Sequence, residues 1–78
     1  MGKAGKALRR VLEDYGISQN QLALAMGINA TNVSRWVNES RDPAGDAIVD
    51  IKNALEKIDP AAAEDFVLGY LYDSELNK

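Results

Sequence analysis

A short polar run between residues 29 and 38 carries side chains that can recognise another molecule through paired hydrogen bonds. Thr31, Asn32 and Arg35 lie close together within it. An arginine can donate two parallel hydrogen bonds to guanine, and an asparagine amide matches the donor and acceptor edge of adenine. A threonine can contact a base or the methyl group of thymine. The chemistry that these residues offer is recognition of a base-pair edge.

The residues on which most enzymes and metal sites depend are missing from the chain. It contains no cysteine and no histidine, which supply most zinc ligands, cysteine nucleophiles and acid–base catalysts that act near neutral pH. Gly5–Lys6 lacks the upstream glycine and the serine or threonine of a phosphate-binding loop. Asp46 and Asp50 lie one helical turn apart without a companion metal ligand. The sequence therefore predicts no enzyme, no metal site and no cofactor.

Charge is distributed unevenly along the chain. The 78 residues carry a formal net charge of −3. Residues 1–41 hold six basic and three acidic side chains, whereas residues 42–78 hold three basic and nine acidic ones. Residues 1–41 are thus modestly basic, which favours contact with nucleic-acid phosphates. Residues 42–78 are acidic, and we call them the acidic back.

Length and hydrophobic periodicity predict a single all-α domain. The chain has room for one core, and no segment alternates apolar and polar residues with the period of a strand. We expect this domain over residues 1–72 and a flexible tail over residues 73–78. No apolar run approaches the roughly 18 residues of a membrane span, and the N-terminus lacks an apolar signal segment, so the expected location is the cytoplasm.

Helical spacing of apolar residues predicts three short helices in the first half of the chain. Their inward-facing residues are Leu8, Val11, Leu12 and Tyr15 in the first, Leu22, Ala23 and Met26 in the second, and Val33, Trp36 and Val37 in the third. Gly16 and Gly27 are expected to end the first two helices, because glycine adopts the left-handed conformation without steric cost. A capping box of Ser18 and Gln21 starts the second helix, and Asn29 is the N-cap of the third.

Two further helices are predicted after residue 42. Asp42–Pro43 is expected to supply the cap and first-turn proline of the fourth helix, and Asp59–Pro60 those of the fifth, which runs from Ala61 to about Tyr72. The apolar stripe of the fourth helix is Ile48, Ile51, Leu55 and Ile58. The fifth has Phe66, Val67, Tyr70 and Leu71 along one side, with Leu68 and Tyr72 on another. This helix either simply closes the core or also forms a dimer surface of Leu68, Tyr70 and Tyr72.

The helix between Ser18 and Gly27, a tight turn and the helix after Asn29 are the parts of a helix-turn-helix, in which the later helix can lie in the DNA major groove. Residues 17–43 also carry Ser18–Gln19, Leu22–Ala23, Gly27, Val33-Ser34-Arg35-Trp36, Asn38 and Pro43. With these features the chain closely resembles the phage-repressor-like helix-turn-helix family, also called the Xre or Cro/C1 type. The resemblance implies a compact five-helix, lambda-repressor-like fold with its motif over residues 18–38.

The same resemblance implies a DNA-contacting surface. In the family the glutamine that opens the second helix lies near phosphates, and the start of the third helix faces base edges. The candidate DNA-contacting residues are Lys3, Lys6, Gln19, Asn29, Ala30, Thr31, Asn32, Ser34, Arg35, Asn38 and Arg41. Simpler roles stay open for some of them: Asn29 can act only as a helix cap, and Lys3, Lys6 and Ser34 can be solvated surface residues.

The sequence departs from the family pattern in three places. Ala30 offers only a methyl group where relatives often carry a polar residue that reads a base. Leu12 and Val37 occupy the positions at which many members pair an arginine with a glutamate, so an apolar contact replaces an ion pair. Glu39 stands where the family usually has a glycine, and its charge would repel a nearby phosphate.

Taken together, these features predict a sequence-specific DNA-binding transcriptional regulator of bacterial or phage type. Its expected partners are double-stranded DNA and a second copy bound through the fifth helix. The alternative is a protein-interaction module, such as an antitoxin or a helix-turn-helix domain that no longer binds DNA. The acidic back, Ala30 and Glu39 favour that alternative, in which the partner is another protein.

Overall fold

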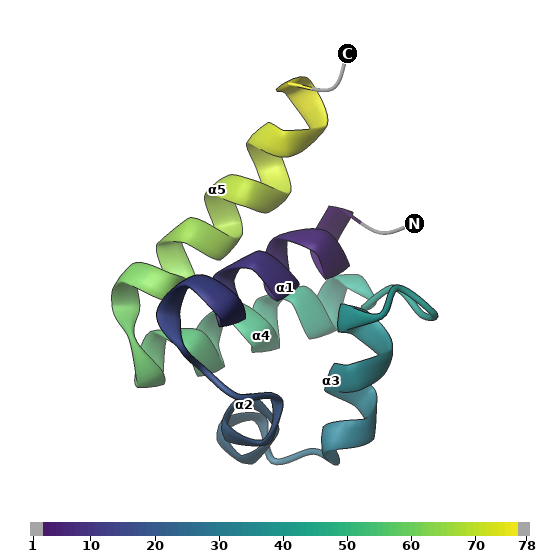
Figure 1. Cartoon of the computed structure of the whole chain (residues 1–78), viewed down its shortest axis with the longest axis vertical. Coiled ribbons are helices and arrows are strands. Elements are labelled where there is room, and N and C mark those ends of the chain that lie inside the picture. The colour runs from purple at the N-terminus through teal and green to yellow at the C-terminus, as the bar shows by residue number, and fades with distance from the viewer. Residues whose placement is uncertain (1–2, 77–78) are drawn as a thin grey trace.

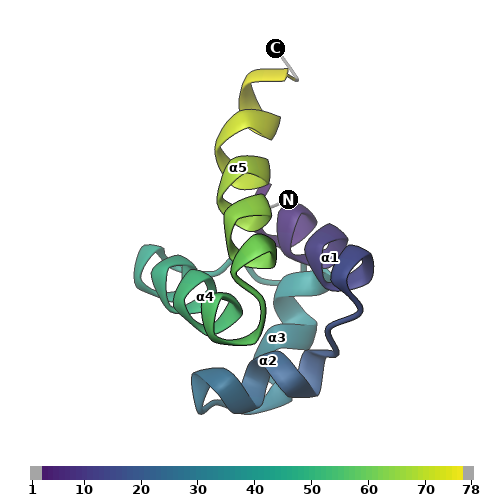
Figure 2. The ribbon, with the colours of Figure 1, turned by 90° about the vertical axis from the view of Figure 1, so that its left-hand side faces the viewer.

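The all-α prediction is confirmed by the computed structural model, which describes residues 3–76 and contains five helices and no strand within them. The helices are α1 (Lys3–Tyr15), α2 (Gln19–Met26), α3 (Ala30–Val37), α4 (Gly45–Ile58) and α5 (Pro60–Leu76). α2 and α3 lie at one end of the molecule, and α5 extends to the opposite end (Figure 1). In the turned view α5 stands between α1 and α4 (Figure 2). The helix-turn-helix pair is therefore held away from the C-terminal end of α5.

One hydrophobic core joins all five helices. Its largest fully buried side chains are Leu8, Val11, Leu22, Val33, Ile51, Leu55 and Phe66. The stripes predicted for the first four helices supply this core, with Tyr15, Met26, Ile48 and Ile58 only half-buried at its edge. Of the residues along the first side of α5, Phe66 is buried and Val67 and Tyr70 are half-buried, whereas Leu71 is 53% exposed.

The predicted starts of α2 and α3 are confirmed. Ser18 Oγ accepts a hydrogen bond from the Gln21 backbone N–H at 3.0 Å, and Gln21 Oε1 accepts one from the Ser18 N–H at 3.3 Å. Asn29 Oδ1 accepts from the Thr31 N–H at 2.9 Å. Each cap satisfies N–H groups that lack partners in the first turn, so both ends of the turn between α2 and α3 are locally specified.

The starts of α4 and α5 differ from each other. Asp59 Oδ1 accepts from the Ala61 N–H at 3.0 Å and Pro60 is the first residue of α5, as predicted. The predicted start of α4 at Asp42–Pro43 is wrong, since the helix begins at Gly45 after Ala44, which makes no side-chain cap hydrogen bond. Pro43 is buried instead, and burying its apolar ring offsets the loss of a cap worth about 1 kcal/mol.

α5 continues past the expected end at Tyr72 and runs to Leu76. The backbone of residues 73–76 is thus helical, and the rest of the expected flexible tail, residues 77–78, lies outside the described residues.

α1, α2 and α3 all end in the same hydrogen-bonded motif around a residue with positive φ. That residue is Gly16 (φ 64°) after α1, Gly27 (φ 71°) after α2 and Glu39 (φ 62°) after α3. In each case two successive N–H groups return to carbonyl groups of the last turn, as with Glu39 N to Trp36 O at 3.1 Å and Ser40 N to Arg35 O at 3.0 Å. Glu39 therefore keeps the loop geometry of the glycine that it replaces and bears the steric cost of a Cβ.

We expect the substitution Glu39→Gly to stabilise the fold by about 1 kcal/mol, because only glycine adopts this conformation without strain. Urea unfolding of the two proteins measures the difference. Ser40→Gly is the matched control, since Ser40 is the next residue and does not have a positive φ. An equal or lower stability of the Glu39→Gly protein would show that the glutamate side chain contributes contacts that outweigh its backbone strain.

A hydrogen bond between side chains ties α1 to α5. Tyr15 Oη donates to Asp65 Oδ2 at 2.5 Å. This bond, with desolvation and the negative charge of Asp65, raises the pKa of Tyr15 from 10.0 to about 12. The protonated phenol is thus favoured by folding, and its contribution to stability is present below pH 10 and is lost as the pH rises towards 12.

A titration of tyrosinate absorbance tests this assignment. The wild type is expected to show one tyrosine that ionises near pH 12, and the Tyr15→Phe variant is expected to lack that transition. Tyr72→Phe, in which an exposed tyrosine of α5 is changed, is the control that keeps it. If the transition that Tyr15→Phe removes lies near pH 10, the Tyr15–Asp65 hydrogen bond does not persist in solution.

Candidate nucleic-acid interface

One face of α3 packs into the hydrophobic core, and the other face lies at the surface. Val33, Trp36 and Val37 are buried in the core. Around the rest of the helix and its caps, Asn29, Thr31, Arg35 and Asn38 are exposed, whereas Ala30, Asn32 and Ser34 are half-buried. The helical period thus separates a packing face from a polar face, and all the base-reading candidates of the sequence lie on or beside the polar one.

Arg35 has the properties that recognition of a guanine requires. Its side chain is exposed and, among the described residues, forms no ion pair with an acidic group. Its own carbonyl oxygen is occupied by Ser40, which fixes the end of the helix. Nearby, Asn38 Nδ2 donates to Ser34 Oγ at 3.3 Å, so these two polar side chains orient each other. The guanidinium is free to donate a bidentate pair.

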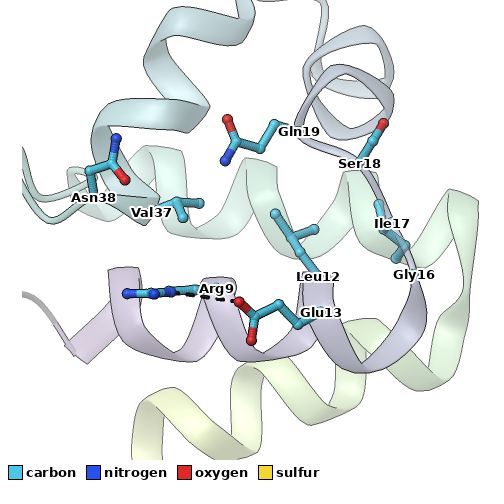
Figure 3. Close-up of a pocket in the computed structure, with 9 residues that line it drawn as sticks. All are labelled: Arg9, Leu12, Glu13, Gly16, Ile17, Ser18, Gln19, Val37 and Asn38. Carbon is cyan, nitrogen blue, oxygen red and sulfur yellow. Dashed lines mark ion pairs between the residues drawn. The ribbon is translucent and has the colours of Figure 1, made fainter.

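A hollow of about 510 Å³ lies between α1, the start of α2 and the end of α3 (Figure 3). Its lining residues are Arg9, Leu12, Glu13, Gly16, Ile17, Ser18, Gln19, Val37 and Asn38. Two of the candidate residues meet here, because Gln19 extends from the start of α2 and Asn38 caps the end of α3. Leu12 and Val37 form its apolar part, which agrees with the pairing inferred for them.

Arg9, which the basic N-terminal part of the sequence already offered for phosphate contact with Lys3, Lys6 and Arg10, also lines this hollow. Its Nε lies 3.7 Å from Glu13 Oε2, and both side chains are largely exposed. An exposed pair of this kind contributes little to stability, so the arginine remains able to turn towards an anion.

The two candidate lysines near the N-terminus come from a different helix than the candidates of α3. Lys3 and Lys6 belong to α1 itself and do not form an extended arm. Lys3 Nζ lies 5.9 Å from the centre of the Tyr70 ring, which places this lysine against α5. Lys6 is exposed on α1, and Arg41 is exposed in the loop after α3. The candidates thus divide into a group around α3 and two lysines on α1, of which Lys3 lies against α5.

An all-α domain in which a capped α2, a glycine turn and a polar-faced α3 form one unit has the arrangement of a helix-turn-helix DNA-binding domain. A family model described as Helix-turn-helix matches residues 8–61, which is more than half of the chain. The chain therefore belongs to this family, of the Xre or Cro/C1 type, and has its lambda-repressor-like fold. No curated protein and no solved structure gives a significant match. Within residues 3–76, no helix combines the length and apolar character of a membrane span.

Proposed function

We propose that this protein is a sequence-specific transcriptional regulator that inserts α3 into the major groove of DNA. The observation that carries the proposal is the division of α3 into a buried apolar face and a polar face with the unpaired Arg35. Thr31, Asn32 and Arg35 would read base edges, and Ala30 would contribute a methyl contact. The remaining candidates near α3, Gln19, Asn29, Ser34, Asn38 and Arg41, would contact the backbone or position the readers. This role suits the cytoplasmic location expected from the sequence.

The first test is an NMR titration of amide shifts with a mixed-sequence DNA duplex at low and then moderate salt. We expect shifts at Gln19 and at residues 29–38 that fade as salt rises, because non-specific binding depends on phosphate contacts. The amides of α4 and α5 serve as the internal control. If no amide shifts appear at low salt, the proposal is contradicted, and a protein-interaction module becomes the favoured function.

Arg35→Ala is expected to weaken specific DNA binding by roughly 1–3 kcal/mol and to relax the preference at one base pair. The fold should not change, because the side chain is exposed. Fluorescence anisotropy with a selected duplex measures the affinity, and a thermal melt confirms the fold. Lys57→Ala removes an equal charge from α4 and is the matched control. An Arg35→Ala protein that binds as the wild type does would refute Arg35 as a reader.

A homodimer through α5 stays a prediction. Of its three expected residues, Leu68 and Tyr72 are exposed, whereas Tyr70 is half-buried with Lys3 beside its ring. A symmetric dimer would set two α3 helices about 34 Å apart for a palindromic site. However, α5 contains four acidic residues and no basic one, so two copies would bring like charges together.

A further inference from the structure

A second hollow lies on the α4–α5 hairpin, outside the surface assigned to DNA. It has a volume of about 420 Å³, and its lining residues are Lys52 and Glu56 from α4 and Pro60, Ala63, Glu64, Val67 and Leu68 from α5. Its lining combines apolar side chains with the charged side chains of Lys52, Glu56 and Glu64, and none of the lining residues comes from α2 or α3.

Exposed apolar side chains extend from this hollow. Leu68 is 42% exposed, Leu71 and Tyr72 are each 53% exposed on the next turn of α5, and Val49 on α4 is 57% exposed. Leu24 on α2 is another large apolar residue that is exposed, at 82%, and it has no such neighbours in sequence on its short helix. Clustered apolar residues with a charged rim mark a surface that binds a protein segment. We call the hollow that Lys52, Glu56, Glu64, Val67 and Leu68 help to line the hairpin groove.

The charge around the hairpin groove decides what can occupy it. Residues 45–72, which cover α4, the turn after it and most of α5, contain six acidic and two basic side chains. One of the two, Lys52, is already paired with Glu56 at 3.4 Å. An amphipathic helix binds such a groove with its apolar face, and complementary charge along its edges sets the partner and the orientation. A second copy of this chain would present the same acidic hairpin and is disfavoured.

We propose that the hairpin groove binds a basic amphipathic helix of another protein. Leucine-type side chains of that helix lie against Leu68 and Leu71, and its lysines or arginines lie near Glu64, the acidic residue of the groove that Lys52 does not pair with. The interaction does not depend on DNA binding, because it uses α4 and α5 and leaves α3 free. It adds to the regulator a surface through which a protein partner acts on it or is recruited to DNA.

The probe for this proposal is a labelled synthetic peptide of leucine and lysine, arranged to form an amphipathic helix, with a leucine and glutamate peptide as the charge control. We expect the basic peptide to bind, with NMR amide shifts at Glu56, Glu64 and Leu68, and the acidic peptide not to bind. Leu68→Ala should weaken binding about tenfold, as expected when one aliphatic contact is lost. Glu64→Gln should weaken it in a manner that disappears at high salt.

Two control variants distinguish binding at the hairpin groove from non-specific binding of the peptide. Leu24→Ala removes a more exposed leucine from α2, and Asp14→Asn removes an exposed carboxylate from α1; both should leave the peptide affinity unchanged. Equal effects of Leu68→Ala and Leu24→Ala, or shifts outside α4 and α5, would overturn the proposal. Sedimentation of the wild type distinguishes the two occupants, because a dimer that Leu68→Ala dissociates would assign the groove to a second copy and overturn the proposal.

Discussion

Gly5→Ala is expected to destabilise the fold by about 3 kcal/mol, although alanine is the better helix former by about 1 kcal/mol. Gly5 lies in α1 where this helix passes the end of α3. A Cβ at this position would overlap the carbonyl oxygen of Trp36 and would lie 3.4 Å from the Cγ of Glu39. A carbonyl of the last turn of α3 cannot swing aside as a side chain can, so α1 and α3 must separate.

Urea unfolding measures this effect, and two other glycines of the same protein provide controls. At Gly45 an added Cβ would meet nothing within 4 Å, so Gly45→Ala is expected to leave stability the same or slightly higher. At Gly69 the Cβ would lie 2.7 Å from a terminal nitrogen of Arg10, which is the flexible end of a long side chain and can move. Gly69→Ala should therefore cost less than Gly5→Ala. If Gly5→Ala melts like Gly45→Ala, then α1 is not held against the end of α3 in solution.

The contrast between Gly5 and Gly27 shows which features a sequence can reveal. Gly27 ends a helix in a motif whose hydrogen bonds return to Ala23 and Leu24, so the spacing of neighbouring residues predicts it. The capping residues Ser18 and Asn29 are likewise recognised from residues within one turn. Glycine is required at position 5 because of the carbonyl group of Trp36, which is far away in the sequence. No local sequence pattern predicts such a contact.

The candidate site divides in the same way. The polar face of α3 could be predicted because the buried stripe of Val33, Trp36 and Val37 fixes which side of a regular helix remains exposed. The place of Lys3 could not, because it depends on how α1 and α5 pack and on the ring of Tyr70 beside it. The exposure of Leu71 could not be predicted for a related reason. Periodicity indicates an apolar side of α5, but it does not indicate whether a neighbouring helix extends far enough to cover Leu71.

Val37→Glu is the other substitution with a large expected effect, a loss of about 3 kcal/mol, because it puts a carboxylate into an apolar site. Val37 is 8% exposed and Leu12 is 6% exposed, and the two side chains line the same hollow below Gln19 and Asn38. Arg9 is the one basic residue among those that line the hollow, and its exposed side chain can offset only part of the cost of burying a carboxylate at position 37. The new charge therefore has to be desolvated without a charged partner at position 12.

The double variant Leu12→Arg with Val37→Glu tests the reason for this loss. It restores the arginine and glutamate that the resemblance places at these positions, so it should regain a large part of the stability that Val37→Glu alone loses. Unfolding of the wild type, both single variants and the double variant forms a cycle that isolates the coupling between the two sites. Val37→Thr, which keeps the shape and adds no charge, is the control and should lose clearly less than Val37→Glu. If the effects of the two single substitutions are additive, Leu12 and Val37 do not act as a pair. The loss of stability in Val37→Glu would then have a cause other than the missing partner at position 12.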